Sequence, residues 1–320
     1  MTDDSRVRII FLGGIGRSGT TLLERSISSG HDVVALGEVM HLWARCLAGD
    51  ELCGCGLPFS DCEFWVEAGR RAFGGWDRVD PARLADLKGA VDRAILVPRL
   101  VSGMSSAKWR DEVREYVSYY SRLYRAISDM TGAGVLIDSS KQVSLAYLLM
   151  TDLALDVRVV HVVRDARAVA YSWTKQVERP EARDGEALFM QTYSPGRLSV
   201  YWMLHNVELD VLGVLRRGRR LRLRYEDWIE SPHDSIARIR KFAGLNVESG
   251  MGHIDGATVT LATAHTCSGN PVRFKTGPVE LRRDTAWLKK LPVRDSSVVA
   301  ALTWPELLHY RYPMRRRGDS

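Results

Sequence analysis

The sequence predicts an α/β fold in which helices cover both faces of a parallel sheet, so that the protein has three layers. Strand-like apolar runs alternate with helical segments along the chain, an alternation typical of parallel sheets. The runs Val7–Leu12 and Arg158–Val163 are apolar at nearly every position, as expected of strands that are buried on both faces. The glycine-rich segment Gly13–Thr21 follows the first run and precedes a helix, which favours a sheet of the P-loop type.

Two stretches of the chain carry most of the predicted sheet. Residues 6–40 have the pattern of a strand, a loop, a helix and a second strand, and residues 134–177 add strand, helix, strand and helix. A helix predicted over 197–216 then leads to a strand over 221–225. The segment 227–242 is amphipathic and completes this part of the chain.

The remaining segments are expected to lie outside the sheet. Residues 41–130 are expected to form a mostly helical insertion over the ligand-binding edge of the sheet, with the clearest helix at 113–130, and a long insertion of this kind is a natural place for ligand recognition. A loop region is predicted over 249–282, before a final helical part. We expect one domain over 1–320, ending in a flexible tail at 312–320.

Composition is that of an ordinary globular protein. The chain has 320 residues, of which 45% are apolar and 26% are charged. The net charge of +6 and the pI near 9.1 suit an anionic ligand. The densest basic block, Arg315–Arg317, sits in the predicted tail, and the spacings of RNA-recognition and zinc-finger modules are missing from the sequence. Nucleic acid is therefore not an expected partner.

The N-terminal sequence does not resemble a targeting signal. The acidic start, Met1–Asp4, runs directly into the first predicted strand, without the charged and apolar regions of a signal peptide. The sequence also has no apolar stretch near the roughly 20 residues that a membrane span requires. We therefore expect a cytoplasmic protein with no membrane span.

The glycine-rich segment predicts an anion-binding loop. Gly14 and Gly19 have the spacing of the Walker A pattern and Thr21 is in place, but Thr20 occupies the position of the lysine. Backbone N–H groups of such a turn, together with a helix N-terminus, bind phosphate, although glycine-rich turns also occur where a chain simply reverses tightly. The nearest cation is Arg17. The candidate ligands are Gly16, Arg17, Ser18, Gly19, Thr20 and Thr21.

Other polar residues are predicted at the same edge of the sheet. Arg164 follows the strand Arg158–Val163, and Ser172 lies eight positions on, two helical turns away and on nearly the same face. This pair could bind a second phosphate. Lys141 ends another short strand and would point into the same crevice. The basic, turn-rich loop His265–Lys275 could fold over a nucleotide or lie as a solvated surface loop.

In this order along the chain, the segments resemble the sulfotransferases that depend on 3′-phosphoadenosine 5′-phosphosulfate (PAPS). The similarity is to the bacterial group akin to the tyrosylprotein and carbohydrate sulfotransferases, and it covers most of the chain. It implies that Arg17–Thr21 binds the 5′-phosphosulfate and that Arg164 and Ser172 bind the 3′-phosphate. The family-like segments near the C-terminus add Tyr225, Gly269, Asn270 and Arg273 to the implied donor site.

The resemblance also implies the reaction and its base. A sulfuryl group would pass from PAPS to a hydroxyl of a small-molecule, carbohydrate or lipid acceptor by in-line attack, leaving adenosine 3′,5′-bisphosphate (PAP). In the tyrosylprotein relatives a Gly-Glu pair follows the phosphosulfate loop, and here Gly37-Glu38 follows the short strand Val33–Leu36. Glu38 is thus the expected general base, unless it is a helix-start glutamate favoured by the helix dipole. Lys141 and Arg17 would stabilise the charge on the leaving phosphate.

No metal is expected to take part in the reaction. A sulfuryl group carries less charge than a phosphoryl group, so the magnesium that kinases require becomes dispensable, in agreement with the missing Walker lysine. Two alternatives stay open. A P-loop small-molecule kinase would need that lysine and a magnesium-binding carboxylate, and a non-catalytic nucleotide-binding protein would tolerate changes at Glu38 and Lys141.

The cysteines are unevenly placed along the chain. Cys46, Cys53, Cys55 and Cys62 crowd one short segment, and Cys267 stands alone. In a reducing compartment free thiols are the default. A disulfide, or a zinc site formed by the four crowded cysteines without paired C-x₂-C knuckles, is an alternative.

Overall fold

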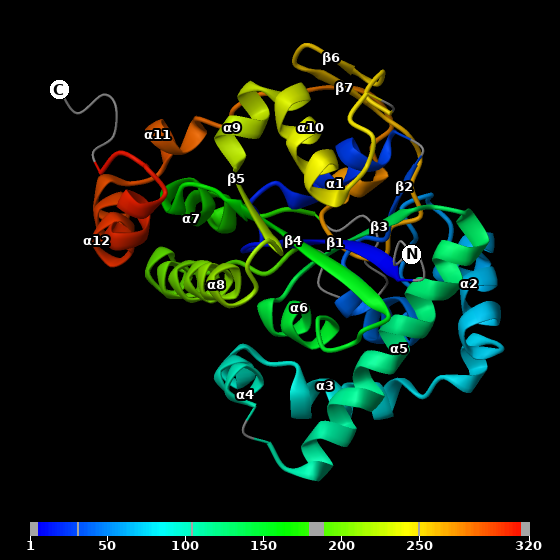
Figure 1. Cartoon of the computed structure of the whole chain (residues 1–320). Helices are drawn as coiled ribbons and strands as arrows, with labels where there is room; N and C mark the ends of the chain where they lie inside the picture. The colour runs from blue at the N-terminus through cyan, green and yellow to red at the C-terminus, as the bar shows by residue number, and fades with distance from the viewer. Residues whose placement is uncertain (1–5, 31, 104, 179–188, 249, 315–320) are drawn as a thin grey trace.

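A parallel sheet of five strands forms the centre of the protein (Figure 1). The computed structural model describes residues 6–30, 32–103, 105–178, 189–248 and 250–314. The strands, in spatial order, are β2 (Val33–Ala35), β3 (Val135–Lys141), β1 (Val7–Gly13), β4 (Leu155–Val163) and β5 (Arg220–Arg224). Each neighbouring pair is parallel, and β1 lies in the middle, with Ile10 between Ile137 and Arg158.

Helices cover both faces of this sheet, which confirms the predicted three-layer α/β fold. Ile9 and Phe11 of β1 pack into one apolar core, whereas Ile10 and Leu12 pack into another on the opposite face, because successive strand residues point to opposite sides. Helices α5 (Ala107–Thr131), α6 (Val143–Leu149) and α8 (Pro195–Leu215) contribute to the first core. Helices α1 (Thr20–Ser28), α9 (Tyr225–Glu230) and α10 (Pro232–Ala243) contribute to the second.

A third core joins the helices beside β4. Helix α7 (Ala166–Thr174) follows β4 directly and packs with α8 and with α12 (Val293–His309), and α11 (Ala286–Lys290) lies against α7 (Figure 1). The predicted strands and helices of residues 6–40 and 134–177 therefore occur in the predicted order.

The segment 41–130 is mostly helical. Its longer elements are α2 (Glu63–Phe73), α3 (Pro81–Val91), α4 (Val97–Ser102) and α5. A π-helical segment at Leu42–Leu47 and 3₁₀ turns at Val39–His41 and Phe59–Asp61 precede α2, and further 3₁₀ turns lie at Trp76–Arg78 and Ala94–Leu96. Helix α5 begins earlier than the predicted 113–130, because Ser106 caps its N-terminus by accepting a hydrogen bond from the Trp109 backbone N–H at 3.3 Å. Three tyrosines and Trp109 line its buried face.

The C-terminal third differs from its prediction in two ways. The predicted loop at 249–282 contains a small antiparallel sheet of β6 (Ile254–Asp255), β7 (Thr258–Leu261) and β8 (Gly277–Glu280), together with a 3₁₀ turn at Pro271–Phe274. The amphipathic segment 227–242 is divided between α9 and α10, because Pro232 has no N–H to continue the first helix and starts the second.

The predicted tail begins too early. Tyr312 is buried, and its hydroxyl donates to Glu226 Oε2 at 2.6 Å, so the segment at 312 is packed against α9. Residues 315–320 lie outside the described part of the chain. Among the described helices, none combines the length and the apolar character that crossing a membrane would require.

Candidate active site

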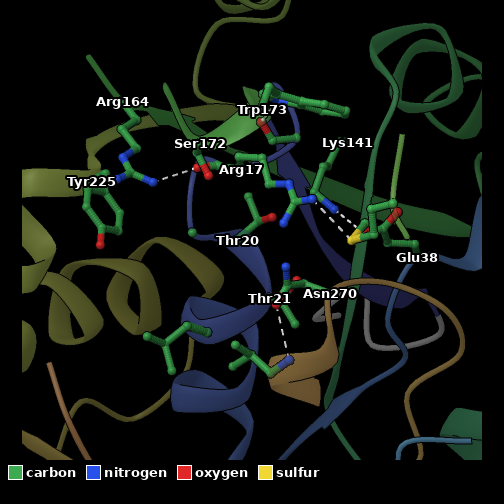
Figure 2. Close-up of a pocket in the computed structure, with 15 residues that line it drawn as sticks. Arg17, Thr20, Thr21, Glu38, Lys141, Arg164, Ser172, Trp173, Tyr225 and Asn270 are labelled. Carbon is green, nitrogen blue, oxygen red and sulfur yellow. Dashed lines mark hydrogen bonds and ion pairs between the residues drawn. The ribbon is translucent and has the colours of Figure 1, made fainter. Parts of the chain in front are cut away.

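A cavity of about 280 Å³ opens at the carboxyl edge of the sheet (Figure 2). The described residues that line it are Gly16, Arg17, Gly19, Thr20, Thr21, Leu22, Glu38, Lys141, Arg164, Ser172, Trp173, Met190, Tyr225, Asn270 and Val272. Each strand of the parallel sheet contributes through its end or the residues just after it. In parallel α/β sheets this is the edge at which ligands bind, so the topology itself gathers these side chains.

The glycine loop presents an uncapped helix to the cavity. Gly19 is the N-cap of α1 and has a left-handed φ of 83°, and no side chain caps the helix. The first turn of α1 holds no acidic residue, so its free N–H groups and positive dipole end are available to an anion. A side chain at Gly19 would also collide with the Tyr225 ring, and one at Gly16 would collide with Trp173. These glycines therefore let aromatic side chains close on the loop.

Arg17 projects into the cavity from this loop. Its backbone has a φ of 73°, its guanidinium lies 5.5 Å from the Trp173 ring centre, and Nη2 is 3.2 Å from the sulfur of Met190. Burial lowers the pKa of Arg17, while the negative charge of Glu38 raises it. Among the described residues, Arg17 Nε has no hydrogen-bond partner. The side chain is thus a partly desolvated cation with a free donor.

Arg164 and Ser172 line the same side of the cavity, as their spacing predicted (Figure 2). Arg164 Nη1 donates to the Arg17 carbonyl at 2.9 Å, and Nη2 donates to Asp284 Oδ2 at 3.1 Å. The guanidinium also stacks on the Tyr225 ring, with its carbon 4.4 Å from the ring centre. These contacts fix the guanidinium at the cavity, and Arg164 Nε has no partner among the described residues.

Glu38 and Lys141 form an ion pair across the cavity from Arg164 (Figure 2). Lys141 ends β3 with a left-handed φ of 68°, and its Nζ donates to Glu38 Oε1. Burial raises the pKa of Glu38 and is the largest single effect. The charge and the hydrogen bond of Lys141 lower this pKa, and so do His41, whose Nε2 is 3.5 Å from Glu38 Oε2, and Arg45. Together these neighbours outweigh burial, so that the net pKa of Glu38 is lowered. Glu38 is therefore a carboxylate at neutral pH.

Buried polar groups hold the turn that carries Glu38. Glu24 of α1 accepts from the Gly37 backbone N–H at 2.8 Å and from the Ser139 hydroxyl at 2.7 Å. On the other side of Glu38, the Ser140 hydroxyl accepts from the Met40 N–H at 2.9 Å. The position of Glu38 is thus determined from both α1 and β3.

The segment 265–275 closes one side of the site. Its Cys267 pairs with the strand end next to Glu38: the Cys267 N–H donates to the Leu36 carbonyl at 2.8 Å, and the Glu38 N–H donates to the Cys267 carbonyl at 2.9 Å. Asn270 lines the cavity and accepts from the Val272 N–H at 3.1 Å. A side chain at Gly269 would come within 3.3 Å of Glu38 Oε1.

Arg273 has a place other than the one predicted. Its guanidinium is fully buried and points away from the cavity, where it pairs with Glu51 at 3.1 Å and donates to the carbonyls of Leu52 and Thr266. Arg273 therefore holds the segment 265–275 against Glu51 and Leu52. Ser18 and Gly269 are not among the described residues that line the cavity either. The Ser18 side chain is fully buried.

Sequence reasoning overlooked several residues of the site. Trp173 and Met190 contact Arg17, and Glu24, Ser139 and Ser140 hold the turn at Glu38. The Ser139-Ser140 pair directly before Lys141 was a usable signal, because polar residues at the end of an apolar strand belong to the site edge. Glu24 had no such signal, since an acidic residue inside an amphipathic helix ordinarily faces solvent.

The fold and the cavity define a class of α/β protein that binds an anionic group at a P-loop-like turn without the Walker lysine. Comparison with known proteins identifies the family. The model of the sulfotransferase domain family matches residues 103–273, which is just over half of the chain. The chain belongs to the sulfotransferase family, and its general activity is sulfuryl transfer. The matched range includes Lys141, Arg164 and Ser172 and leaves out the Arg17–Thr21 loop and Glu38.

Two solved structures share the fold along nearly the whole chain. The sulfotransferase domain of the olefin synthase from Synechococcus PCC 7002 is 18% identical and has a TM-score of 0.51, covering 98% of this chain and 98% of that one. The sulfotransferase domain from the curacin biosynthetic pathway is 14% identical, with a TM-score of 0.50, and covers 97% of this chain and 100% of that one. The sequence matches no curated protein.

Proposed function

We propose that this sulfotransferase takes its sulfuryl group from PAPS and transfers it to a hydroxyl of a small-molecule, carbohydrate or lipid acceptor. The observation that carries the proposal is the meeting of the Glu38–Lys141 pair, Arg17 and the uncapped start of α1 in one cavity. A carboxylate that can accept a proton thus lies beside donors that can stabilise a leaving phosphate.

The donor set fits a nucleotide with two separate phosphate groups. The N–H groups of Thr20 and Thr21 and the guanidinium of Arg17 would hold the 5′-phosphosulfate. Arg164 and Ser172, on the other side of the cavity, would hold the 3′-phosphate. The unpartnered Nε atoms of Arg17 and Arg164 support this fit, because buried donors in folded proteins normally have a partner.

The residues of the chain divide the chemistry between them. When bound, the donor supplies a sulfuryl group activated by its bond to the 5′-phosphate. Glu38 accepts the proton of the acceptor hydroxyl while the hydroxyl oxygen forms a bond to sulfur. At the same time the bond breaks between sulfur and the oxygen that bridges it to the 5′-phosphate. Lys141 and Arg17 donate to the bridging and phosphate oxygens, where negative charge accumulates. The former bridging oxygen stays on the 5′-phosphate of PAP without a proton, and the acceptor leaves as its sulfate ester.

In this scheme Lys141 can pair either with Glu38 or with a phosphate of the donor. In the free protein it neutralises Glu38 and keeps the pKa of that carboxylate low. A bound phosphate would attract Lys141 away from Glu38. Glu38 would then become a stronger base at the time when an acceptor proton must be removed.

The kinase alternative has less support from the cavity. Of the described residues that line it, Glu38 is the only carboxylate, and Lys141 already neutralises it. A kinase would need a carboxylate free to bind magnesium and a lysine where Thr20 stands. The non-catalytic alternative does not account for the polar contacts that hold the Glu38 turn from two sides.

The insertion 41–130 is the proposed acceptor-binding part. A second cavity of about 340 Å³ lies within it, close in sequence to Glu38, and its lining includes Met40, Trp43, Leu84 and Lys88. The apolar character of most of this lining suits an acceptor with an apolar body. The segment 178–200, also expected to help choose the acceptor, lies partly outside the described residues.

Calorimetry with PAP and with ATP tests the donor. We expect PAP to bind at least tenfold more tightly than ATP with magnesium, because two separate anion sites match its two phosphates. The acceptor is then sought by transfer of ³⁵S from labelled PAPS to a panel of sugars, phenols and lipid alcohols. Preference for ATP, or failure to bind PAP, would contradict the proposal.

A further inference from the structure

Three cysteines and a histidine meet outside the active site. The sulfur atoms of Cys53, Cys55 and Cys62 and one ring nitrogen of His265 all lie within 4.8 Å of one another. The structure therefore differs from the four-cysteine zinc site considered from the sequence in one of the four residues. Cys46 lies instead beside Cys267, and His265, from a distant part of the sequence, takes its place.

The spacing of these atoms matches tetrahedral zinc. Zinc binds thiolate sulfur at about 2.3 Å and imidazole nitrogen at about 2.0–2.1 Å, so the edges of the tetrahedron are about 3.8 Å between sulfurs and about 3.6 Å between sulfur and nitrogen. Cys62 Sγ is 3.6 Å from Cys53 Sγ and 3.7 Å from Cys55 Sγ. His265 Nδ1 is 3.2 Å from Cys62 Sγ and 3.8 Å from Cys53 Sγ.

The backbone around the cluster has the form of a metal knuckle. The Cys53 N–H donates to the Leu57 carbonyl at 2.8 Å and the Gly56 N–H to the Cys53 carbonyl at 2.8 Å, which closes a tight hairpin. The hairpin carries Cys53 and Cys55, two positions apart in the chain, into the same cluster as Cys62.

Two further contacts hold His265 at the hairpin. Its ring stacks on Phe64, with centres 4.9 Å apart and planes at 3°. A side chain at Gly54 would lie 2.4 Å from Thr266 Oγ1, so only glycine lets the hairpin approach the segment of His265 this closely. The fourth ligand is thus oriented by packing on both sides.

The other interpretations of the cysteines fit this geometry less well. A disulfide requires a sulfur–sulfur distance of about 2.05 Å, and all five cysteines are free thiols in the structure. Separate free thiols would not need three sulfurs and a ring nitrogen to converge on one point. We propose that Cys53, Cys55, Cys62 and His265 bind a structural zinc ion, with all four positions taken by the protein.

The proposed ion would join the insertion to the donor site. Cys53, Cys55 and Cys62 belong to the start of the insertion, whereas His265 lies two residues before Cys267, which pairs with the backbone of Glu38. Arg273, buried against Glu51 and Leu52, fastens the same segment further along. The zinc site is therefore structural, separate from the reaction chemistry, and its proposal does not depend on the identity of the donor.

Metal analysis of the full-length protein tests this site. Protein purified without chelator from zinc-supplemented cells is expected to hold one zinc ion per chain by mass spectrometry. Exchange with cobalt should give the visible bands of tetrahedral Co²⁺ and thiolate charge transfer. Cys55→Ser and His265→Ala should lower the zinc content at least tenfold, while Cys46→Ala, which removes a buried thiol outside the cluster, should retain it.

A second measurement keeps the test decisive if the variants do not fold. Titration of the folded wild-type protein with a mercurial, in the presence of a chromophoric chelator, should release one zinc ion per chain. Wild-type protein that holds no zinc and gives no cobalt spectrum would overturn the proposal. A disulfide between any two of the three cysteines in the native protein, or full zinc content in His265→Ala, would do the same.

Discussion

At Glu38, burial and neighbouring cations act on the carboxyl group in opposite directions. Burial favours the neutral acid, but the charged Lys141 favours the carboxylate, and the net pKa of Glu38 lies below its ordinary value. His41 itself is held neutral near pH 7, since burial lowers its pKa to about 4. Glu38 is therefore ionised near pH 7, as the proposed general base must be, and Lys141 is the charged partner that keeps its pKa low.

We predict that Glu38→Gln lowers turnover by about 100-fold or more while PAP affinity stays within about twofold. The amide keeps the size and most hydrogen bonds of the side chain but cannot accept the acceptor proton, and general base catalysis contributes about 10²–10⁴-fold. Steady-state kinetics and calorimetry measure the two quantities. Glu280→Gln, at an exposed carboxylate also paired with a cation, is the matched control and should keep full activity. Near-full turnover in Glu38→Gln would assign the base to another residue.

Arg164 and Ser172 should differ in how much they contribute to donor binding. A hydrogen bond to a charged group contributes about 1.5–3 kcal/mol. Arg164→Ala should therefore weaken PAP binding by about tenfold to a hundredfold, and Ser172→Ala, which loses a neutral donor, by less. Calorimetry with both variants measures this. Adenosine 5′-phosphate, which lacks the 3′-phosphate, is the control ligand and should bind the wild-type and Ser172→Ala proteins alike. Unchanged PAP affinity in both variants would remove these residues from the 3′-phosphate site.

At the scale of elements, the turn at Gly37–Met40 depends on a buried acid in α1. Burial raises the pKa of Glu24 from its ordinary value of 4.5 to about 7, although its hydrogen bonds to Ser139 and Gly37 oppose the shift. The folded protein therefore keeps the proton on Glu24 at pH values where the unfolded chain has released it. This difference stabilises the fold fully below pH 4.5, and the stabilisation is lost as the pH rises to about 7.

We predict that Glu24→Gln becomes more stable relative to the wild type as the pH rises from 5 to 8. The variant does not titrate, and each unit of pKa corresponds to about 1.4 kcal/mol, so the relative change amounts to a few kcal/mol. The Tm of both proteins, measured across this range, gives the difference directly, and any constant loss from the altered hydrogen bonds cancels. Glu280→Gln is again the control and should show no such trend. A Tm difference independent of pH would contradict the raised pKa.

The strand–helix units could be predicted because their signal is local. Buried parallel strands are apolar along their whole length, and the segments that follow Leu12, Leu36 and Val163 supply polar and glycine residues of the site. The common edge of the sheet then brings them together. The sequence alone therefore predicts that Arg17, Glu38, Lys141, Arg164 and Ser172 lie at one edge of the sheet, and all five line the cavity.

The parts that were missed depend on pairing between distant segments. Strands β6, β7 and β8 have only two to four residues each, so their pattern does not differ from that of a loop. The resemblance implies that Arg273 binds the donor, but in the structure the buried Glu51 neutralises its charge. His265 joined the cysteine cluster through a contact that spans about two thirds of the chain. Sequence spacing carries no information on such contacts.

At the scale of the whole molecule, the absence of a free acid in the described cavity lining predicts how the enzyme responds to metals. Turnover should be unchanged by brief EDTA treatment and by added Mg²⁺, because Arg17, Lys141 and the loop N–H groups provide the charge that magnesium supplies in kinases. Initial rates with labelled PAPS measure this. Immediate loss restored by Mg²⁺ would favour the kinase alternative. Slow loss together with a fall in Tm, restored by Zn²⁺ and not by Mg²⁺, would point to the cluster at His265.

The strand order has a consequence for the nascent chain. β1 is synthesised more than a hundred residues before its neighbours in the sheet, β3 and β4. Until then an apolar strand lies with both edges unpaired, which is a form prone to aggregation and a natural substrate for chaperones. The glycine loop emerges with β1, but its partners Arg164, Tyr225 and Asn270 follow much later. The proposed donor therefore has no complete site until the segment that carries Asn270 has been translated, and it can stabilise the chain only from that point on.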